Sequence, residues 1–318
     1  MSRIDNEPSL HDEAARAGWL YYVGGMTQDQ IATELGVSRQ RAQRLVSRAM
    51  AEGLIQVRLN HDIGACLELE AALTRRFGLT RCRVAPSLGP GVDPSRATAP
   101  AAAAELERVL RMPDSKVIAF GTGRALRAMV EQFSPSEAKP HRIVSLLGNI
   151  APDGSATLYD VISRIAEKLD APYYPMPVPV ISDTPEERAF FMALRPVRSV
   201  YEMAKSADVT FVGVGQMGPD APLALDGFVT PDVLAELQEQ GAAGEIVSWV
   251  YDERGHYIES PRNALVGGVQ IARNRSEPVI AVAAGPRKVR AIHAALIGCI
   301  INGLVTDDST ARAILALG

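Results

Sequence analysis

The sequence predicts an α/β protein, with an N-terminal winged helix-turn-helix domain and a larger Rossmann-like α/β domain. Three observations lead to this fold class. The first sixty residues have the pattern of helices followed by one short alternating segment. After residue 60, short apolar runs alternate with amphipathic stretches, as in strand–helix–strand units of a mostly parallel sheet. Glycine-rich turns follow several of those runs, as they do at the carboxyl ends of parallel strands.

Composition excludes several classes of protein. The length of 318 residues favours two domains. Apolar residues make up 47% and charged residues 22%, so wholesale disorder and fibrous repeats are excluded. The net charge of −4 excludes a chain-wide basic coat, and any DNA contact must come from a locally basic face. Cys66, Cys82 and Cys299 form no CxxC pair, so we expect no metal, no cofactor and no disulfide framework.

The sequence also indicates where the protein works. Acidic residues among the first fifteen positions are incompatible with the apolar region of a signal peptide. The uncharged run Ala291–Val305 spans fifteen residues, which is too short to cross a bilayer. We therefore expect a cytoplasmic protein without a membrane partner.

A helix-turn-helix pattern lies between residues 27 and 50. Thr27-Gln28-Asp29-Gln30 is a capping box that starts a short helix. Gly36 suits a tight turn between two steeply crossing helices, Val37 plugs that turn, and Ser38 caps the next helix. This order of features predicts a DNA-reading module; the alternative is an ordinary helical packing module over residues 12–60.

The second helix of this module presents a polar, positively charged face. Apolar residues such as Ala42, Leu45 and Ala49 cluster on the other side, and no acidic residue occurs from 38 to 48. Glutamine pairs with adenine and arginine with guanine in the major groove, while flanking arginines suit phosphates. The alternating segment Leu54–Leu59 predicts a wing that brings Arg58 near the DNA backbone. The predicted DNA-binding residues are therefore Ser38, Arg39, Gln40, Arg41, Gln43, Arg44, Arg48 and Arg58.

Residues 1–60 thus form the predicted DNA-binding domain, and residues 61–318 form the second domain. The second domain begins with a connecting helix at 61–78, because Asp62–Phe77 has apolar residues at helical spacing and Gly78 ends it. The Pro- and Gly-rich segment Pro86–Pro100 is predicted to be a loop. The predicted strands are Val117–Phe120, Ile143–Leu147, Val209–Val214, Ile246–Tyr251 and Val279–Ala284, and the predicted helices are Arg124–Phe133, Leu158–Leu169, Pro231–Gln240 and Val289–Cys299.

Capping residues support the helix assignments. Thr184-Pro185-Glu186-Glu187 puts a hydroxyl before a helix, proline at its first position and a carboxylate two residues later. Thr230-Pro231 repeats the first two features, and Gly241 ends that helix. Tyr173–Pro179 is extended, but its prolines exclude a central strand, so it lies at a sheet edge or lines a pocket.

Glycine-rich exits from the predicted strands indicate a small-molecule site. Ligands of open α/β sheets bind beyond the carboxyl ends of strands, where loop amides and helix N-termini favour anions and hydroxyls. Each exit taken alone is also explained as a turn that needs glycine, and Lys288 as a surface lysine. Taken together, the exits predict effector-binding residues at Gly121, Thr122, Gly123, Arg124, Gly148, Asn149, Gln216, Asp252 and Lys288.

The stretch Tyr251–His256 has two interpretations. Asp252, Glu253 and His256 together are capable of acid–base chemistry. The tip Glu253-Arg254-Gly255 is also that of a plain hairpin turn. We favour the turn, with Asp252 directed at ligand hydroxyls, because no other loop supplies a second carboxylate or base at matched spacing. No catalytic residue is therefore assigned.

Nearly the whole chain resembles the SorC family of sugar-binding transcriptional regulators, which is related to DeoR. The resemblance includes the helix-turn-helix Gln28–Met50 and Gly121-Thr122-Gly123. The other matching segments are Cys66–Glu70, Phe77–Leu79, Leu225–Gly227, Tyr251-Asp252, Gly285–Lys288, Ala291-Ile292 and Leu304–Asp307. The stretches Val144–Gly148 and Ile165–Val180 are most similar to the branch that responds to sugar alcohols such as erythritol.

The resemblance implies an effector domain similar to glucosamine-phosphate deaminases and pentose-phosphate isomerases, without their activity. It implies a sugar, polyol or sugar-phosphate ligand, held by the Gly121–Gly123 loop, Arg124 and Lys288. It further implies a homodimer or homotetramer on a palindromic, double-stranded operator. Two departures from the family pattern are Ala284-Gly285 before the lysine and Gly148-Asn149, at positions where Gly-Gly is common.

The expected function is regulation of a carbohydrate or polyol catabolic operon, with DNA affinity controlled by the bound effector. One alternative is an active sugar-phosphate isomerase or deaminase fused to a DNA-binding module. Another is a DNA-binding module fused to a purely oligomeric domain. The sequence leaves open the identity and phosphorylation state of the effector, activation or repression, dimer or tetramer, and the operator sequence.

Overall fold

The computed structural model describes residues 9–55, 63–133, 141–151, 153–154 and 161–317. The chain divides into two compact units, Met1–His61 and Asp62–Gly318. Within the described residues, no helix is both long enough and apolar enough to span a bilayer.

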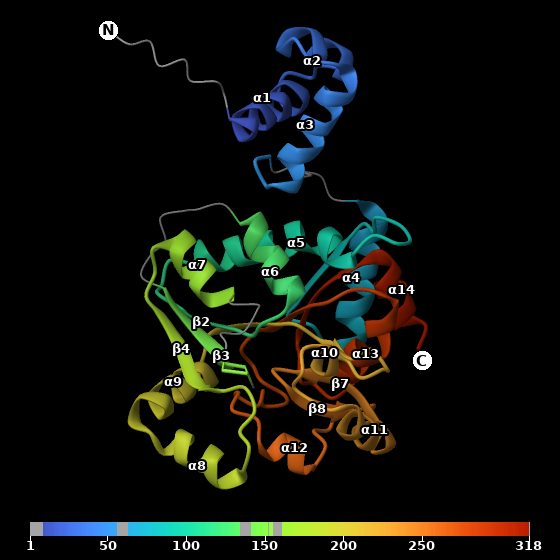
Figure 1. The fold of residues 1–318 in the computed structure, drawn as a ribbon. Coiled ribbons are helices and arrows are strands. Elements are labelled where there is room, and N and C mark those ends of the chain that lie inside the picture. The colour runs from blue at the N-terminus through green and yellow to red at the C-terminus, as the bar shows by residue number, and fades with distance from the viewer. Residues whose placement is uncertain (1–8, 56–62, 134–140, 152, 155–160, 318) are drawn as a thin grey trace, which may run out of the picture. The chain divides into compact units, whose positions relative to one another are not determined.

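The first unit is a three-helix module of α1 (Leu10–Tyr22), α2 (Gln28–Leu35) and α3 (Arg39–Ala51) (Figure 1). The capping box at Thr27 is confirmed, because Thr27 Oγ1 accepts a hydrogen bond from Gln30 N and Gln30 Oε1 accepts one from Thr27 N. Gly36 ends α2 in the left-handed region, at a φ of 63°. Ser38 caps α3, so the predicted helix-turn-helix is present.

Small side chains let the three helices pack closely. Ala14 and Ala17 of α1 meet Ala42 and Ala49 of α3 in a core that also contains Ile31. Leu54 and Ile55 pack against the same core. The rest of the predicted wing, including Arg58, lies outside the described residues.

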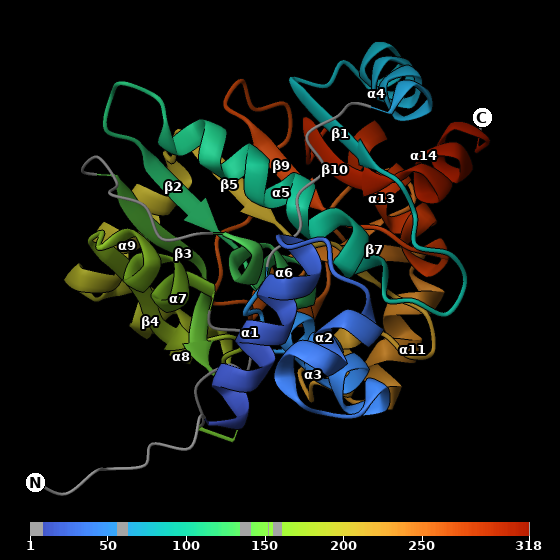
Figure 2. The same cartoon turned by 90° about the horizontal axis from the view of Figure 1, so that it is seen from above.

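The second unit contains a seven-stranded sheet in the order β1-β10-β9-β5-β2-β3-β4, and every neighbouring pair is parallel. Figure 2 shows β4 at one edge of this sheet and β1 at the other. The strands are β1 (Arg81–Ala85), β2 (Val117–Phe120), β3 (Arg142–Ile150), β4 (Tyr173–Pro179), β5 (Val209–Val212), β9 (Val279–Val282) and β10 (Gly303–Asp307). The predicted parallel sheet is confirmed, and the proline-containing β4 is an edge strand, as its prolines require.

Helices cover both faces of the sheet because strand residues alternate between two cores. Ile118 and Phe120 of β2 pack with α5 (Pro94–Leu110), α6 (Arg124–Gln132) and α7 (Val161–Leu169). Val117 and Ala119 face the other core, which holds α4 (Gly64–Phe77), α9 (Arg195–Lys205), α13 (Val289–Ile297) and α14 (Asp308–Leu315). Phe120 and Phe211 stack with ring centroids 5.4 Å apart.

A small antiparallel sheet of β6 (Gly215–Gln216), β7 (Ala242–Ile246) and β8 (Trp249–Asp252) follows β5. The remaining elements are α8 (Pro185–Ala193), α10 (Pro222–Leu225), α11 (Pro231–Glu239), α12 (Pro261–Ala264) and the 3₁₀ helix η1 (Pro286–Lys288). The caps predicted at Thr184 and Thr230 are confirmed, since each side chain accepts a backbone N–H three residues on.

Two predicted elements were wrong. Residues 94–100 are not loop but the start of α5, where Asp93 caps the helix and Pro94 occupies its first turn. Pro100 is accommodated inside that helix. The predicted strand Ile246–Tyr251 is not one continuous strand: β7 ends at Ile246, β8 begins at Trp249, and Val247 and Ser248, with φ values of 55° and 63°, form the hairpin turn between them.

Candidate functional site

A cavity of 920 Å³ opens at the carboxyl ends of the parallel strands. Its walls come from the loops that follow β1, β2, β3, β5 and β9, together with β7 and the segment around α10. This is the position at which open α/β sheets bind small molecules. Gly121, Thr122, Gly123, Arg124, Gln216 and Lys288 of the predicted site all line the cavity.

The Gly121–Arg124 loop turns the chain from β2 into α6. Gly123, the residue before α6, has a φ of 122°, which a residue with a Cβ rarely adopts. No side chain caps α6, and Arg124 and Ala125 at its start line the cavity. The amide of Gly121 is already bonded to Phe211 O at 2.8 Å, so it holds the loop against β5. The uncapped helix start offers N–H donors to a ligand oxygen.

The loop before Lys288 is held by a relay of hydrogen bonds. Asp307 Oδ1 accepts from Thr310 N at 2.7 Å, and Thr310 Oγ1 accepts from Gly285 N at 2.8 Å. Gly285 has a φ of 114° and leads directly into η1, which ends at Lys288. The relay therefore fixes the backbone from which Lys288 enters the cavity.

Lys288 is opposed by a carboxylate that sequence reasoning missed. Glu245 of β7 lines the same cavity, and its side chain lies over Gly215, where no Cβ is present to exclude it. Burial lowers the pKa of Lys288, and the negative charge of Glu245 offsets part of that effect. Burial likewise raises the pKa of Glu245. The hydrogen bond from Ser248 N and the positive charges of Arg262 and Lys288 lower that pKa, but they offset only part of the effect of burial.

Arg262 on α12 lies behind this pair and is 7% exposed. Its Nη1 donates to Ser248 O, while Nε and Nη2 have no partner among the described residues. Burial lowers the pKa of Arg262 to about 10, and the charge of Glu245 opposes this. Ser248 joins the two side chains, because its N–H also donates to Glu245 Oε2 at 2.9 Å.

Every cationic side chain in the described lining has an acidic neighbour there. Arg287 pairs with Asp220, Lys288 interacts with Glu245, and Arg124 interacts with Asp226. Burial raises the pKa of Asp226, and the positive charge of Arg124 counteracts this. Asp93 and Asp153 add two further carboxyl groups to the lining. The cavity therefore combines donors and acceptors without an excess of cationic side chains.

Gly148 and Asn149 line a neighbouring cavity of 140 Å³, which shares Gly121 and Thr122 with the large one. A Cβ on Gly148 would lie 2.5 Å from the carbonyl oxygens of Val178 and Pro179, so the backbone of β4 requires glycine there. Tyr173 and Pro175 of β4 also line this cavity. The sequence of β4 predicted a sheet edge or a pocket lining, and the strand in fact does both.

Two predicted site residues have different roles from those expected. The side-chain amide of Gln216 donates to Asp220 O and Oδ1, each at 2.9 Å, so it holds the loop beside the cavity. Asp252 lines neither cavity; its Oδ1 accepts from Arg254 N and His256 N at 2.9 and 2.8 Å. The expectation that Asp252 faces the ligand is therefore corrected, because the turn itself uses the carboxylate.

The possible acid–base group also lies away from the cavity. Glu253 pairs with Arg290, and His256 Nδ1 lies 3.7 Å from Asp252 Oδ2 within the same turn. Neither residue lines a cavity described here. Within the residues that the structure covers, no cluster of three His, Cys, Asp or Glu side chains suits a metal ion.

The second candidate site is the outward face of α3. Ala42, Leu45, Val46 and Ala49 are buried, while Arg39, Gln40, Arg41, Gln43 and Arg44 are exposed. The flanking arginines form ion pairs within the unit: Arg39 with Asp29 at 3.4 Å, Arg41 with Glu13 at 2.8 Å, and Arg48 with Glu52 at 2.5 Å. Arg44 forms no ion pair with another described residue. At the centre of the exposed face, Arg44 is thus not ion-paired with any acidic side chain that the structure describes.

Two family models match the chain. The model described as "Putative sugar-binding domain" matches residues 61–316, and a MarR family model matches residues 17–62. These two matches correspond to the two kinds of site found in the structure.

Curated relatives match nearly the full chain. The erythritol catabolism regulatory protein EryD of Brucella abortus is 35% identical, over 95% of this chain and 96% of its own. The deoxyribonucleoside regulator of Bacillus subtilis is 29% identical, over 99% of each chain. Among solved structures, the full-length sorbitol operon regulator SorC from Klebsiella pneumoniae is 27% identical with a TM-score of 0.72, covering 95% of this chain and 97% of its own.

Proposed function

The chain belongs to the SorC family of sugar-binding transcriptional regulators, and from that premise we propose that it controls a polyol catabolic operon through an effector bound in the 920 Å³ cavity. It is a transcriptional regulator with a helix-turn-helix and a sugar-binding domain. Within this function we assign residues 1–60 to DNA reading and residues 61–318 to effector binding and oligomerisation. The two compact units of the chain support that division. The protein would work in the cytoplasm, where operator DNA lies.

The observation that carries the choice of ligand is the pairing of charges around the cavity. A phosphate dianion favours surplus cationic side chains, but Arg124, Arg287 and Lys288 each have an acidic neighbour. Carboxylates, ammonium and guanidinium groups together with backbone N–H groups suit a compound that carries many hydroxyls, each both a donor and an acceptor. An uncharged sugar alcohol therefore fits the cavity better than a sugar phosphate.

Similarity to EryD directs the proposal toward erythritol and related sugar alcohols. The cavity is larger than a four-carbon polyol, so five- and six-carbon polyols and bridging waters also fit. We assign effector contacts to the start of α6 at Gly123 and Arg124, to Thr122, to Lys288 and to Glu245. Gly148 and Asn149 would shape the neighbouring end of the site.

On the DNA side, we assign base reading to Gln40, Gln43 and Arg44 of α3. Arg39, Arg41 and Arg48, which flank this face, would contact phosphates, with Ser38 at the start of the helix and Arg58 beyond the described residues. A surface arginine exchanges a weak surface ion pair for a phosphate contact at small cost.

The test is a titration of the full-length protein on its own promoter DNA. Fluorescence anisotropy would be recorded with erythritol, ribitol, sorbitol, erythritol phosphate and a hexose phosphate as separate ligands. We expect an uncharged polyol to change operator affinity by about fivefold or more, since couplings of this kind are typically 1–3 kcal/mol. A response only to phosphorylated ligands would refute the charge argument, and no response to any of them would refute effector control.

A further inference from the structure

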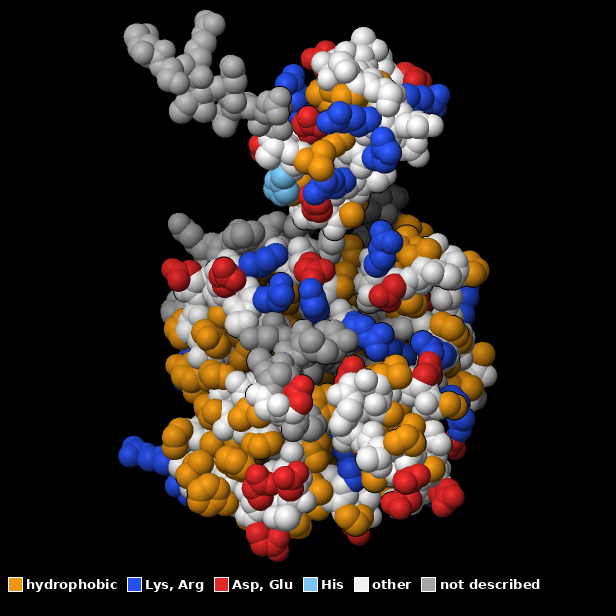
Figure 3. All heavy atoms as spheres, in the orientation of Figure 1, with side chains coloured by type: hydrophobic (Ala, Val, Ile, Leu, Met, Phe, Trp, Pro, Cys, Tyr) orange, Lys and Arg blue, Asp and Glu red, His pale blue; other side chains and the backbone are white. Residues whose placement is uncertain are grey.

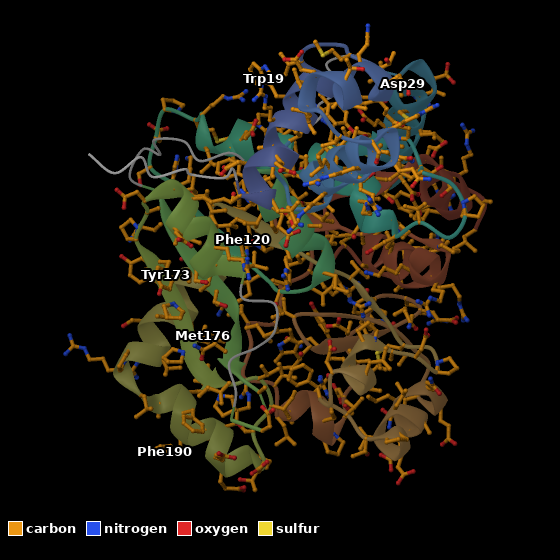
Figure 4. All side chains as sticks on the ribbon, turned by 45° about the horizontal axis from the view of Figure 1, so that its top comes forward. Trp19, Asp29, Phe120, Tyr173, Met176 and Phe190 are labelled. Atoms are coloured by element: carbon orange, nitrogen blue, oxygen red, sulfur yellow. The ribbon has the colours of Figure 1, made fainter. Side chains whose placement is uncertain are left out.

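Helix α8 presents an apolar face that the rest of its own unit leaves uncovered. The helix packs on α9, yet none of its residues is buried. Phe190 is 64% exposed, and Figure 4 shows it on the outer side of the unit. Its neighbour Phe191 is partly buried against the large core, with the two ring centroids 5.8 Å apart. Phe190 is therefore held in position from behind while its outer face is open.

The exposed face of α8 carries an acidic side chain at its start, followed by apolar ones. Glu186, Phe190 and Ala193 lie three or four residues apart and so share one helix face, with Ala189 beside them. Leu194, which is 39% exposed, follows directly. Figure 3 shows hydrophobic side chains gathered over this part of the surface, next to acidic ones.

The charges at the two ends of the exposed face of α8 have opposite signs. Glu186 lies at the N-terminal end of α8, whereas Arg195 and Arg198 lie just beyond its C-terminal end. All three are exposed, and none forms an ion pair with another described residue. A single exposed phenylalanine would be unremarkable, so the charge order is what identifies an occupant.

We propose that this surface, formed by Glu186, Ala189, Phe190, Ala193, Leu194, Arg195 and Arg198, binds the same surface of a second copy of the chain. A two-fold axis near Phe190 makes the two α8 helices antiparallel, which brings Glu186 of each copy near Arg195 of the other. Each Phe190 then fits over the small side chains Ala189 and Ala193 of the facing helix. A parallel arrangement would instead oppose Glu186 to Glu186, which is unfavourable.

The proposal is independent of the effector, because none of these residues lines either cavity. It supplies an isologous contact of the kind that a regulator of a palindromic operator needs. The edge strand β4 is protected from pairing by its prolines, so the helix is the better contact surface in this region.

The test is sedimentation equilibrium of the full chain over a hundredfold range of concentration, without DNA. We expect Phe190→Glu to halve the molar mass of the wild-type assembly, whether that assembly is a dimer or a tetramer. Leu88→Glu is the matched control, because Leu88 is 55% exposed on the same unit and lies outside the proposed surface. Circular dichroism would establish that both variants are folded. An unchanged mass for Phe190→Glu, or a monomeric wild type, would overturn the proposal.

A charge exchange tests the antiparallel geometry separately. Glu186→Arg should weaken association at least tenfold, since it brings like charges together, and Glu186→Arg with Arg195→Glu should restore most of the loss. High salt should reduce both effects, because the pairs lie near solvent. If the double variant associates no better than Glu186→Arg alone, the two helices do not meet in this arrangement. Binding of an unlike partner at this surface would leave the mass of the purified protein unchanged by every substitution.

Discussion

Lys288 and Glu245 are charged groups whose environment disfavours their charges. Burial lowers the pKa of the lysine and raises that of the glutamate, and their mutual attraction does not cancel either shift. Their attraction contributes little to folding, since attraction between buried charges seldom repays their desolvation. Perturbed pKa values in a cleft are typical of functional sites. Here they identify Lys288 and Glu245 as residues to which a bound ligand would supply the missing polar partners.

Substitution of Lys288 by methionine should separate effector binding from stability. We expect Lys288→Met to weaken polyol binding more than tenfold in calorimetry, because it removes an enclosed donor. The effector-free variant should be at least as stable as the wild type, since a buried cation is lost. Arg287→Met is the control: the side chain of Arg287 is 71% exposed, so a threefold effect or less is expected. Equal losses in the two variants would mean that Lys288 is not a ligand contact.

The pH dependence of stability follows from the same shift. In the folded protein burial holds the pKa of Lys288 below the ordinary lysine value of 10.5, so between the folded pKa and 10.5 only the unfolded chain keeps the proton. The cost of the buried cation is therefore fully present below the folded pKa and disappears as the pH rises toward 10.5. Urea unfolding from pH 7 to 10.5 should show this gain in the wild type relative to Lys288→Met. A constant difference between the two proteins across that range would contradict the assignment.

At the scale of elements, residues at and after the end of β10 hold the loop before Lys288 in place. Asp307 caps α14, and Thr310 in the first turn of α14 accepts a hydrogen bond from the amide of Gly285. The start of α14 therefore supports the loop that leads to Lys288. Thr310 is 1% exposed and does not line either cavity. Its role is therefore to position the loop rather than to contact the ligand.

Thr310→Val should leave the amide of Gly285 buried without a partner. We expect a loss of about 1–3 kcal/mol in the free energy of unfolding, and weaker effector binding without any change at a contact residue. Thr310→Ser keeps the hydroxyl and should retain binding within twofold of the wild type. Urea denaturation and calorimetry on both variants give the two quantities. Unchanged effector affinity in Thr310→Val would show that the relay does not control Lys288.

The arrangement of side chains on the exposed face of α3 predicts which residues contact bases and which contact phosphates. Arg44→Ala should lower affinity for the operator by roughly 1–3 kcal/mol and relax discrimination against a single base change, as expected for base reading. Arg39→Ala should weaken operator and unrelated DNA alike and reduce the salt slope by about one. Anisotropy titrations with operator and scrambled duplexes at two salt concentrations distinguish the two. The same response from both variants would contradict the assignment of Arg44 to bases and Arg39 to phosphates.

Local patterns predicted many of the elements, because caps and periodicity decide them within a few residues, but β1, β10, α9 and α14 were not predicted. The capping box at Thr27, the caps at Thr184 and Thr230, and the alternation of strands with helices were all confirmed. The start of α5 was missed because Pro94 and Pro100 indicate a loop, whereas Asp93 and Pro94 in fact begin a helix. The β7–β8 hairpin was missed because its turn residues Val247 and Ser248 take positive φ without glycine or asparagine.

The candidate site was predictable only in its loops. Gly121–Arg124 and Gly285–Lys288 carry glycine at the turns where helices start, so the sequence itself indicates them. Glu245 gives no such signal, because one glutamate in a strand resembles a solvent-facing position. Only the pairing of β7 with β6, which puts Glu245 opposite Gly215, brings it into the cavity. Asp252 shows the reverse error: its residue type suggests a ligand contact, but the adjacent turn uses its oxygens.

At the scale of the whole molecule, the helix-turn-helix and the sugar-binding domain of the regulator lie in separate units. Effector and DNA therefore influence one another only through a difference in stability between two states of the complete chain. A ligand that binds both states equally tightly would shift nothing, however high its affinity. If a polyol binds in the cavity as proposed, the size of regulation is set by how differently the cavity binds it in those two states.

This requirement makes the coupling reciprocal, which gives a test on the intact protein. If a polyol changes operator affinity by a given factor, saturating operator DNA must change polyol affinity by the same factor and in the same sense. Calorimetric titration of the full chain with the polyol, alone and with a twofold excess of operator duplex, measures one side; anisotropy measures the other. A scrambled duplex is the control, and it should produce a smaller change.

The two factors must agree within error, because binding free energies around a closed cycle sum to zero. If DNA leaves the measured polyol affinity unchanged while the polyol alters DNA binding, the two titrations do not report the same equilibrium: either calorimetry detects a polyol site that is not the one coupled to DNA, or a change of assembly contributes to one titration. The Phe190→Glu variant then decides between these, since its assembly is altered and its cavity is intact.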